Sequence, residues 1–221
     1  MSLGSHDVFV TIESTARFSV QRHTIKQLTD SALNGILKMS KTPLNYWAEF
    51  VVDIPLGVVL IYAGLHHGDL NSAMAILTIL LGLFLFTFIE YFIHRRLLHG
   101  SVQFIVRGHR AHHENPLNYD GLPFFLPAFM LMGIIGMCVS IVPTNYAFLL
   151  TGTIALGYTT YGLSHFSIHH HRFRQAFARN WAANHHIHHY HAETNFGVTT
   201  PLWDILLGSR YVRLDRRGSQ E

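Results

Sequence analysis

Histidine is the residue type in this chain whose number and spacing could support metal chemistry. The sequence contains 18 histidines, and ten of them form two matched sets, each a spaced pair followed by the pattern His-x-x-His-His. The upstream set is His94, His99, His109, His112 and His113, and the downstream set is His165, His169, His185, His188 and His189. Imidazole is the commonest side-chain ligand for metals such as iron, zinc, copper and nickel. Ten imidazoles exceed what one ion binds, so the pattern predicts two metal ions.

The spacing inside the sets predicts where the imidazoles point. Residues three or four apart lie on one face of an α-helix, so the histidines of each His-x-x-His-His pattern should share a direction, as should His165 and His169. His94 and His99 are five apart and are expected to diverge at a helix end. The other histidines do not fit the spacing and are expected to bind no metal: His6, His23, His66, His67, His170, His171, His186 and His191.

The elements that must position these histidines are apolar stretches. Hydrophobic residues make up 49% of the chain and charged residues 13%, about half the usual charged share. A helix crosses a bilayer with about 20 apolar residues, and residues 47–65, 72–93, 122–142 and 146–163 are candidates. The first is the weakest of the four, because Asp53 and Pro55 interrupt it. For any single stretch, the buried core helix of a soluble protein is the alternative.

The distribution of basic residues favours the membrane interpretation. All 16 Lys and Arg residues lie in residues 1–46, 94–121 and 164–221, whereas residues 66–71 and 143–145 contain none. Basic residues collect on the cytosolic side of membrane proteins. The sequence therefore predicts an all-α, multi-pass membrane protein with four transmembrane helices in two hairpins. Both termini and a helical cap holding both histidine sets should be cytosolic, in a plasma or inner membrane rather than the endoplasmic reticulum. Because the basic residues flank spans, we expect no nucleic-acid binding.

The chain divides into three predicted regions. Residues 1–46 form a polar segment with moderately amphipathic stretches at 18–29 and 31–40, residues 47–212 form the membrane domain, and residues 213–221 form a polar tail. Five aromatic residues are expected to form belts at the membrane interfaces: Trp47, Tyr62, Tyr91, Tyr146 and Tyr161.

The histidine patterns resemble those of the fatty acid hydroxylase/sterol desaturase superfamily of membrane di-iron enzymes. Residues 94–99 and 109–113 look like its first two histidine boxes. The pair at 165 and 169 and the box at 185–189 look like those of its fatty acid 2-hydroxylase branch, and residues 196–209 resemble the segment that follows. The resemblance covers about residues 45–212. It implies two iron ions held by the ten histidines, with zinc as an alternative in the isolated protein, and dioxygen as co-substrate. Since no haem domain is fused at either end, it also implies a separate electron-transfer protein.

The predicted function is hydroxylation of a membrane lipid, with a fatty acyl chain attacked near its head group. Desaturation of a sterol or another lipid and hydroxylation of a carotenoid use the same kind of metal site and remain open. A metal transporter would need ligands along the spans, and no histidine lies at the centre of any of them. A zinc-dependent membrane hydrolase would use fewer ligands than these ten.

Ligating histidines usually donate their second ring N–H to an oxygen acceptor. The sequence offers several candidate acceptors and does not rank them: Glu90, Glu114, Asp120, Asn184, Glu193, Asn195 and Asp204. Beyond the metal ligands, no catalytic residue is identified.

Overall fold

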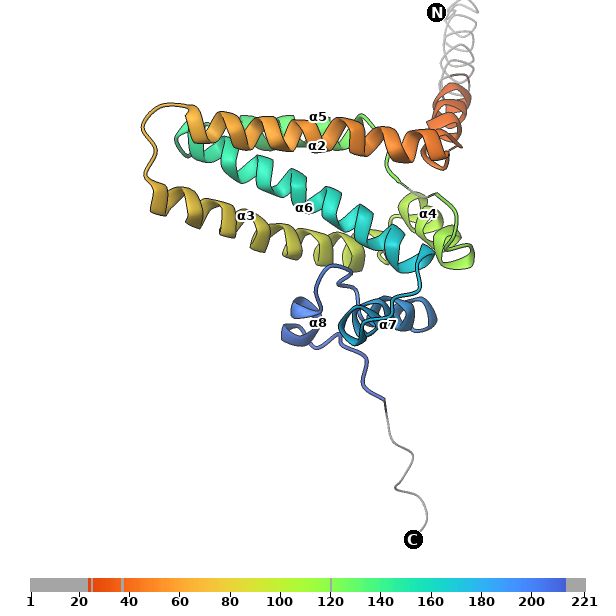
Figure 1. Cartoon of the computed structure of the whole chain (residues 1–221). Coiled ribbons are helices and arrows are strands. Elements are labelled where there is room, and N and C mark those ends of the chain that lie inside the picture. Colours follow the sequence, from red (N-terminus) through yellow and green to blue (C-terminus); the bar gives the residue numbers. More distant parts are fainter. Residues whose placement is uncertain (1–23, 25, 37, 120, 214–221) are drawn as a thin grey trace, which may run out of the picture.

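The computed structural model describes residues 24–213 except residues 25, 37 and 120, and every regular element among these residues is a helix (Figure 1). The all-α fold class is therefore confirmed. Residues 26–36 and 38–40 are helical and precede the named elements. In chain order these are α2 (Pro43–His66), α3 (Ser72–Ile93), the π-helical turn η1 (His94–Leu98), α4 (Gln103–Glu114), α5 (Leu126–Cys138), α6 (Thr144–His170), α7 (Ala176–Tyr190) and α8 (Leu202–Leu206).

Two of the helices are long and apolar enough to cross a membrane. These are α2 and the continuous helix formed by α3 and η1, Ser72–Leu98. Both begin at a capping side chain. The Thr42 hydroxyl accepts a hydrogen bond from the Asn45 amide (3.2 Å), and the Asn71 amide oxygen accepts one from the Met74 amide (3.1 Å). These caps satisfy backbone donors that have no partner inside the helix.

The helix predicted over residues 122–142 is shorter in the structure. α5 has 13 residues, a length of about 20 Å, against a bilayer core of about 30 Å. Its start is delayed to Leu126, with Pro127 in the first turn, where the missing N–H has no cost. Its end at Cys138 is followed by turns at residues 139–141 that lead to Pro143.

α6 is the central helix, and it packs against α2, α3 and α5. Small residues permit this close packing. A Cβ placed on Gly152 would lie 2.8 Å from the Gly57 carbonyl oxygen of α2, and one placed on Gly64 would lie 2.7 Å from the Asn145 carbonyl oxygen. The apolar core at Phe86, Leu131, Ile154 and Ala155 lies where α3, α5 and α6 meet.

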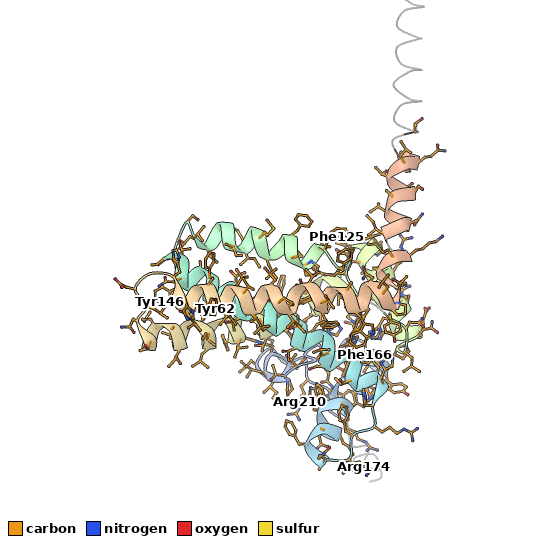
Figure 2. All side chains as sticks on the ribbon, turned by 45° about the horizontal axis from the view of Figure 1, so that its top comes forward. Tyr62, Phe125, Tyr146, Phe166, Arg174 and Arg210 are labelled. Carbon is orange, nitrogen blue, oxygen red and sulfur yellow. The ribbon has the colours of Figure 1, made fainter. Side chains whose placement is uncertain are left out.

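The tips of the two hairpins lie together at one end of the bundle. The Asn145 side-chain amide donates to the Asp69 carbonyl (3.1 Å), and the Asn71 amide donates to the Tyr146 hydroxyl (3.3 Å). Figure 2 shows Tyr62 and Tyr146 at this end, with Arg174 at the other. α4 and α7, which carry histidine patterns, lie at the end opposite the tips.

Two of the five predicted belt aromatics do not face a membrane interface. Tyr91 is buried, and its hydroxyl lies 2.9 Å from the Ser209 hydroxyl. Tyr161 lines an internal cavity and packs on the apolar core. For both residues the prediction is wrong, because the ring faces a neighbouring segment of the chain.

Candidate metal centre

The ten histidines of the two sets converge into two groups of five. Within each group, one ring nitrogen from every histidine lies within 4.8 Å of all the others. The upstream group consists of His94, His99, His109, His113 and His188, and the downstream group consists of His112, His165, His169, His185 and His189. The groups adjoin, since the rings of His113 and His189 stack with centroids 4.3 Å apart.

The middle histidine of each His-x-x-His-His pattern crosses to the other group. On α4, His109 and His113 are four apart and share a group, while His112 joins the group built mainly from α6 and α7. On α7 the crossing residue is His188. The helical spacing therefore predicts correctly that histidines four residues apart lie in the same group. The three histidines of one His-x-x-His-His pattern, however, are divided between the two groups.

The π-helical turn brings His94 and His99 together. Positions five apart on an α-helix are separated by about 140° around the axis, which is why divergence was expected. In η1 the His99 amide donates to the His94 carbonyl (3.1 Å), and this wider turn carries residue i+5 back over residue i. The two ring centroids are 5.2 Å apart, so the expected divergence does not occur.

The nitrogen positions fit a bound cation. Nε2 of His109 lies 3.1 Å from Nε2 of His94, 2.9 Å from that of His99 and 3.1 Å from that of His113. One ring nitrogen carries either one proton or one lone pair, so it can make a hydrogen bond with only one of these neighbours. A cation placed among the nitrogens would bind all of their lone pairs.

The spacing of the nitrogens also indicates the kind of coordination. A metal–imidazole bond of about 2.1 Å places ligands at right angles about 3.0 Å apart and tetrahedral ligands about 3.4 Å apart. Four nitrogen pairs in the upstream group are separated by 2.9–3.1 Å, His185 Nε2 lies 3.0 and 3.1 Å from two neighbours in the downstream group, and the other pairs lie within 4.8 Å. Five donors at this spacing differ from the four of a tetrahedral structural zinc site.

Burial keeps the imidazoles neutral, as metal ligands must be. Desolvation lowers the pKa of His113 to about 4, of His169 and His188 to about 3, and of His189 to about 2. It lowers the pKa of His185 well below its usual value. At neutral pH these rings therefore carry lone pairs.

Two backbone carbonyls orient histidine rings of the upstream group. His94 donates from Nδ1 to the Phe196 carbonyl (2.5 Å), and His188 donates from Nδ1 to the Thr194 carbonyl (2.7 Å). With the proton on Nδ1, the Nε2 lone pair faces the upstream group. Asn195, between these carbonyls, has a positive φ of 54°. Its side chain bonds the Asn184 carbonyl (3.2 Å) and the Tyr211 amide (2.8 Å), which fixes this unusual conformation.

Buried carboxylates hold the same segment in place. Asp204 accepts hydrogen bonds from the amides of Phe196 and Gly197 and from the Ser209 hydroxyl, each at 2.8 Å. Glu90, on α3, accepts from the Val198 amide (2.5 Å) and the Thr199 amide (2.9 Å). These residues support the carbonyls rather than contacting the imidazoles.

Among the described residues, the remaining predicted acceptors and the histidines that are expected to bind no metal lie outside the two histidine groups. Glu114 and Glu193 are exposed, and Asp120 lies outside the described residues. Asn184 donates to the Gly197 carbonyl (3.4 Å) and belongs to the supporting network. Six of the histidines that were expected to bind no metal are described, and all six lie outside both groups: His66, His67, His170, His171, His186 and His191. His6 and His23 lie outside the described residues.

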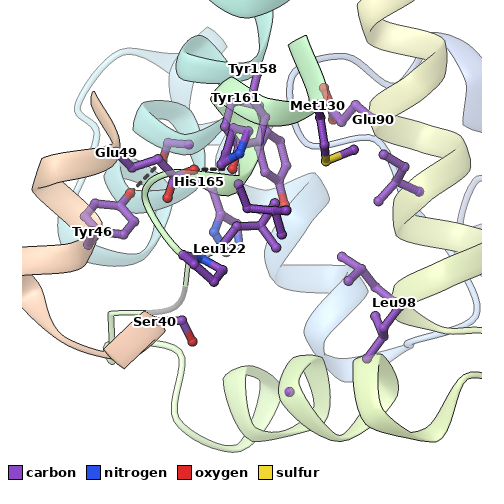
Figure 3. Close-up of a pocket in the computed structure, with 18 of the residues that line it drawn as sticks. Ser40, Tyr46, Glu49, Glu90, Leu98, Leu122, Met130, Tyr158, Tyr161 and His165 are labelled. Atoms are coloured by element: carbon purple, nitrogen blue, oxygen red, sulfur yellow. Dashed lines mark hydrogen bonds between the residues drawn. The ribbon is translucent and has the colours of Figure 1, made fainter. Parts of the chain in front are cut away.

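A cavity of about 560 Å³ connects the helical bundle with the histidines. Most of its wall is apolar, and both groups contribute to it: His94 and His109 from one, His112 and His165 from the other. Figure 3 shows Tyr46 and Glu49 of α2 on one side, with Glu90 and Leu98 on the other. Residues 33, 36, 40 and 41, which precede α2, also line the cavity.

Sequence reasoning missed two parts of this site. The acceptors for His94 and His188 are backbone carbonyls, which leave no side-chain signature. The second missed part is a polar pair in the cavity wall, in which the Tyr158 hydroxyl donates to Glu49 Oε1. The only signal in the sequence is a carboxylic acid in an apolar stretch, which marks a functional candidate in a membrane helix.

Known proteins resemble this chain in sequence. The sequence model of the family described as Fatty acid hydroxylase matches residues 79–209, more than half of the chain. The chain is 27% identical over 176 residues to the dihydroceramide fatty acyl 2-hydroxylase FAH1 of Arabidopsis thaliana, covering 74% of this chain and 73% of that protein. It is 31% identical over 142 residues to the fatty acid 2-hydroxylase of Macaca fascicularis, covering 57% of this chain but 37% of that protein.

A solved structure shares the fold. The hydroxylase domain visible in the structure of full-length Scs7p aligns with a TM-score of 0.68 and 26% identity, covering 79% of this chain and 69% of that one. All ten grouped histidines fall within the matched residues 79–209. This chain belongs to the fatty acid hydroxylase family.

Proposed function

We propose that this protein is a membrane di-iron oxygenase that hydroxylates an acyl chain close to its lipid head group. Membership of the family makes it an oxidoreductase and a lipid hydroxylase. The names of its relatives describe fatty acyl and ceramide-linked chains, and these supply the proposed substrate class. Two electrons would come from a separate electron-transfer protein.

The observation that carries this proposal is the shared cavity. It is lined by apolar side chains of α3, α5 and α6 and by histidines of both groups. An acyl chain lying among Phe86, Leu131 and Ile134 would present its opposite end to the histidines. Carbons next to the head group are then the ones offered for reaction.

Different residues would bind the ions, orient the imidazole rings and position the substrate carbon. The ten imidazoles would hold two ions, and the carbonyls of Thr194 and Phe196 keep two of the rings correctly oriented. Bound iron supplies oxidation chemistry in which dioxygen, two electrons and two protons convert C–H to C–OH and release one water. The apolar wall excludes bulk water and positions the carbon.

Iron is proposed over zinc because of the donor set. Each group offers five nitrogen donors, and the pairs that lie 2.9–3.1 Å apart have the separation of ligands at right angles. A structural zinc site takes four ligands in a tetrahedron, and zinc has no redox chemistry to offer. Imidazole is a ligand suited to iron.

We also propose that α5 and α6 cross the membrane together with α2 and α3. The hydrogen bonds between the hairpin tips support a common side for residues 66–71 and 143–145, and those residues contain no Lys or Arg. The histidine helices and both termini would then be cytosolic. Residues 47–212 would form the membrane domain, and residues 33, 36, 40 and 41 add part of the cavity wall.

The test is oxygen incorporation. Purified protein in lipid, supplied with iron, reductant and an N-acyl lipid, should produce a 2-hydroxyacyl product that contains oxygen-18 from labelled dioxygen. Label from water would overturn the oxygenase assignment, and a product with two fewer hydrogens and no added oxygen would identify a desaturase. His188→Ala should abolish the product, whereas the exposed tip variant His67→Ala should not.

A further inference from the structure

The short helix α8 exposes a set of large aliphatic side chains. Ile205 is 52% exposed, Leu206 62% and the following Leu207 50%. Three consecutive exposed residues of this size are unusual on a surface in contact with water. In this structure they occur in the segment that supports the histidine groups, since Asp204 lies in the same helix.

α8 is attached to the side of α3, a helix able to cross a membrane. The Trp203 indole donates to the Thr87 hydroxyl (3.0 Å), and its ring lies 5.2 Å from that of Phe84 and 4.8 Å from that of Phe88. Thr87 is six residues before the end of α3, about 9 Å along the helix axis. Figure 1 shows α8 beside α3.

The chain turns back sharply after these aliphatic residues. Gly208 has a φ of 68°, and the Ser209 amide donates to the Asp204 carbonyl (2.9 Å), which forms a glycine-terminated helix end. The exposed Arg210 follows directly, and its long side chain could reach lipid phosphates while its stem covers apolar surface. An indole, aliphatic side chains and a flanking arginine are the composition of a membrane-interface element.

We propose that α8 and Leu207 are inserted into the lipid bilayer, as an anchor that connects the membrane to the histidine groups. The exposed side chains continue the apolar surface of α3, where Phe84 and Phe88 are 49% and 38% exposed. A second copy of the chain is a poorer occupant, because a stable protein interface buries about 800 Å² on each side and α8 has only five residues. The proposal rests on the membrane setting of the proposed function, but not on the reaction.

A short path links this anchor to a candidate metal ligand. Asp204 of α8 binds the Phe196 amide (2.8 Å), and the carbonyl of Phe196 accepts the hydrogen bond from His94 (2.5 Å). Moving α8 out of the membrane would therefore move the segment that orients His94. Lipid contact at Leu206 would help to position the upstream group.

The experiment places a fluorescent bimane label at single cysteines in a Cys138→Ala background, in protein reconstituted in phosphatidylcholine vesicles. The test site is Leu206→Cys. The lipid control is Leu80→Cys on α3, a residue that is 57% exposed, and the aqueous control is Arg174→Cys, which lies away from the bundle (Figure 2). Quenching by lipids brominated along the acyl chain is compared with quenching by iodide in the buffer.

We expect the label at residue 206 to be quenched by brominated lipid at half or more of the level at residue 80, and several-fold less by iodide than at residue 174. Iodide quenching equal to that at residue 174 would overturn the proposal. Protection from both quenchers, with cross-linking between copies, would also overturn it and identify a protein interface. The readout requires no catalytic activity, so its failure is distinguishable from failure of the proposed function.

Discussion

Asp204→Ala should loosen the upstream histidine group without touching a histidine. The substitution removes three hydrogen bonds, to the Phe196 amide, the Gly197 amide and the Ser209 hydroxyl. Hydrogen bonds to a charged group contribute about 1.5–3 kcal/mol each, a total of roughly 4.5–9 kcal/mol. Because water can reach part of the opened segment, we expect a loss of about 4.5 kcal/mol, at the lower limit.

This loss should appear as weaker metal binding. The freed segment contains the carbonyls that accept from His94 and His188, and loss of such acceptors lowers metal affinity about 10- to 100-fold. The assay is metal content by mass spectrometry after dialysis against chelators of increasing strength, together with the thermal unfolding midpoint. Asp204→Asn, which keeps one acceptor oxygen, should be intermediate, and Asp69→Ala at the exposed hairpin tip is the matched control. If Asp204→Ala retained its metal and its unfolding midpoint, the supporting role of the segment would be refuted.

Three further outcomes are expected. His112→Ala and His188→Ala should each lower the iron content of purified protein from about two ions toward one, whereas His67→Ala should leave it unchanged; unchanged iron in both histidine variants would contradict the grouping. Tags inserted in residues 66–71 and 143–145 should be accessible from the non-cytosolic side and tags at either terminus from the cytosol, so termini on opposite sides would exclude four spans. Ile134→Trp fills part of the apolar wall of the cavity, so kcat/KM for long acyl chains should fall roughly ten- to a hundred-fold, a loss of about 1.4–2.8 kcal/mol, while short chains are spared. Met132→Trp, exposed on the same helix, is the control for that variant, and equal losses for short and long chains would show that the cavity does not bind the chain.

The sequence predicts the participants of the site better than their arrangement. Pairs four apart, such as His109 with His113, fall into one group because helical periodicity depends only on local structure. Which group His112 joins depends on how α4 packs against α6 and α7, and no local pattern encodes that. His94 and His99 were misjudged because a π-helical turn differs from an α-helix by a single hydrogen-bond shift. The carbonyl acceptors at residues 194 and 196 depend on a positive φ at Asn195, a conformation that asparagine tolerates but does not require.

The apolar stretches were also only partly informative. Residues 72–93 give a helix close to the predicted bounds, because almost every residue in them favours lipid or core. Residues 122–142 give a helix of 13 residues, because Pro123 and Pro127 restrict the backbone at its start whatever the hydrophobicity and turns follow Cys138. Crossing of the membrane by α5 and α6 stays a prediction, since it depends on the lipid as well as on the chain.

The exchange of His112 and His188 between the groups has a consequence for assembly. As the chain is synthesised, the first hairpin and α4 bring four imidazoles of the upstream group, but the fifth arrives only with α7. The downstream group is complete only when α6 and α7 have been synthesised, although His112 precedes them in the chain. Neither group can be completed by one half of the protein, so loading of either ion would report that both hairpins have already docked. Metal binding would then stabilise the tertiary structure only after the two hairpins have packed together. Removal of the ions should separate the two hairpins from each other before either of them unfolds.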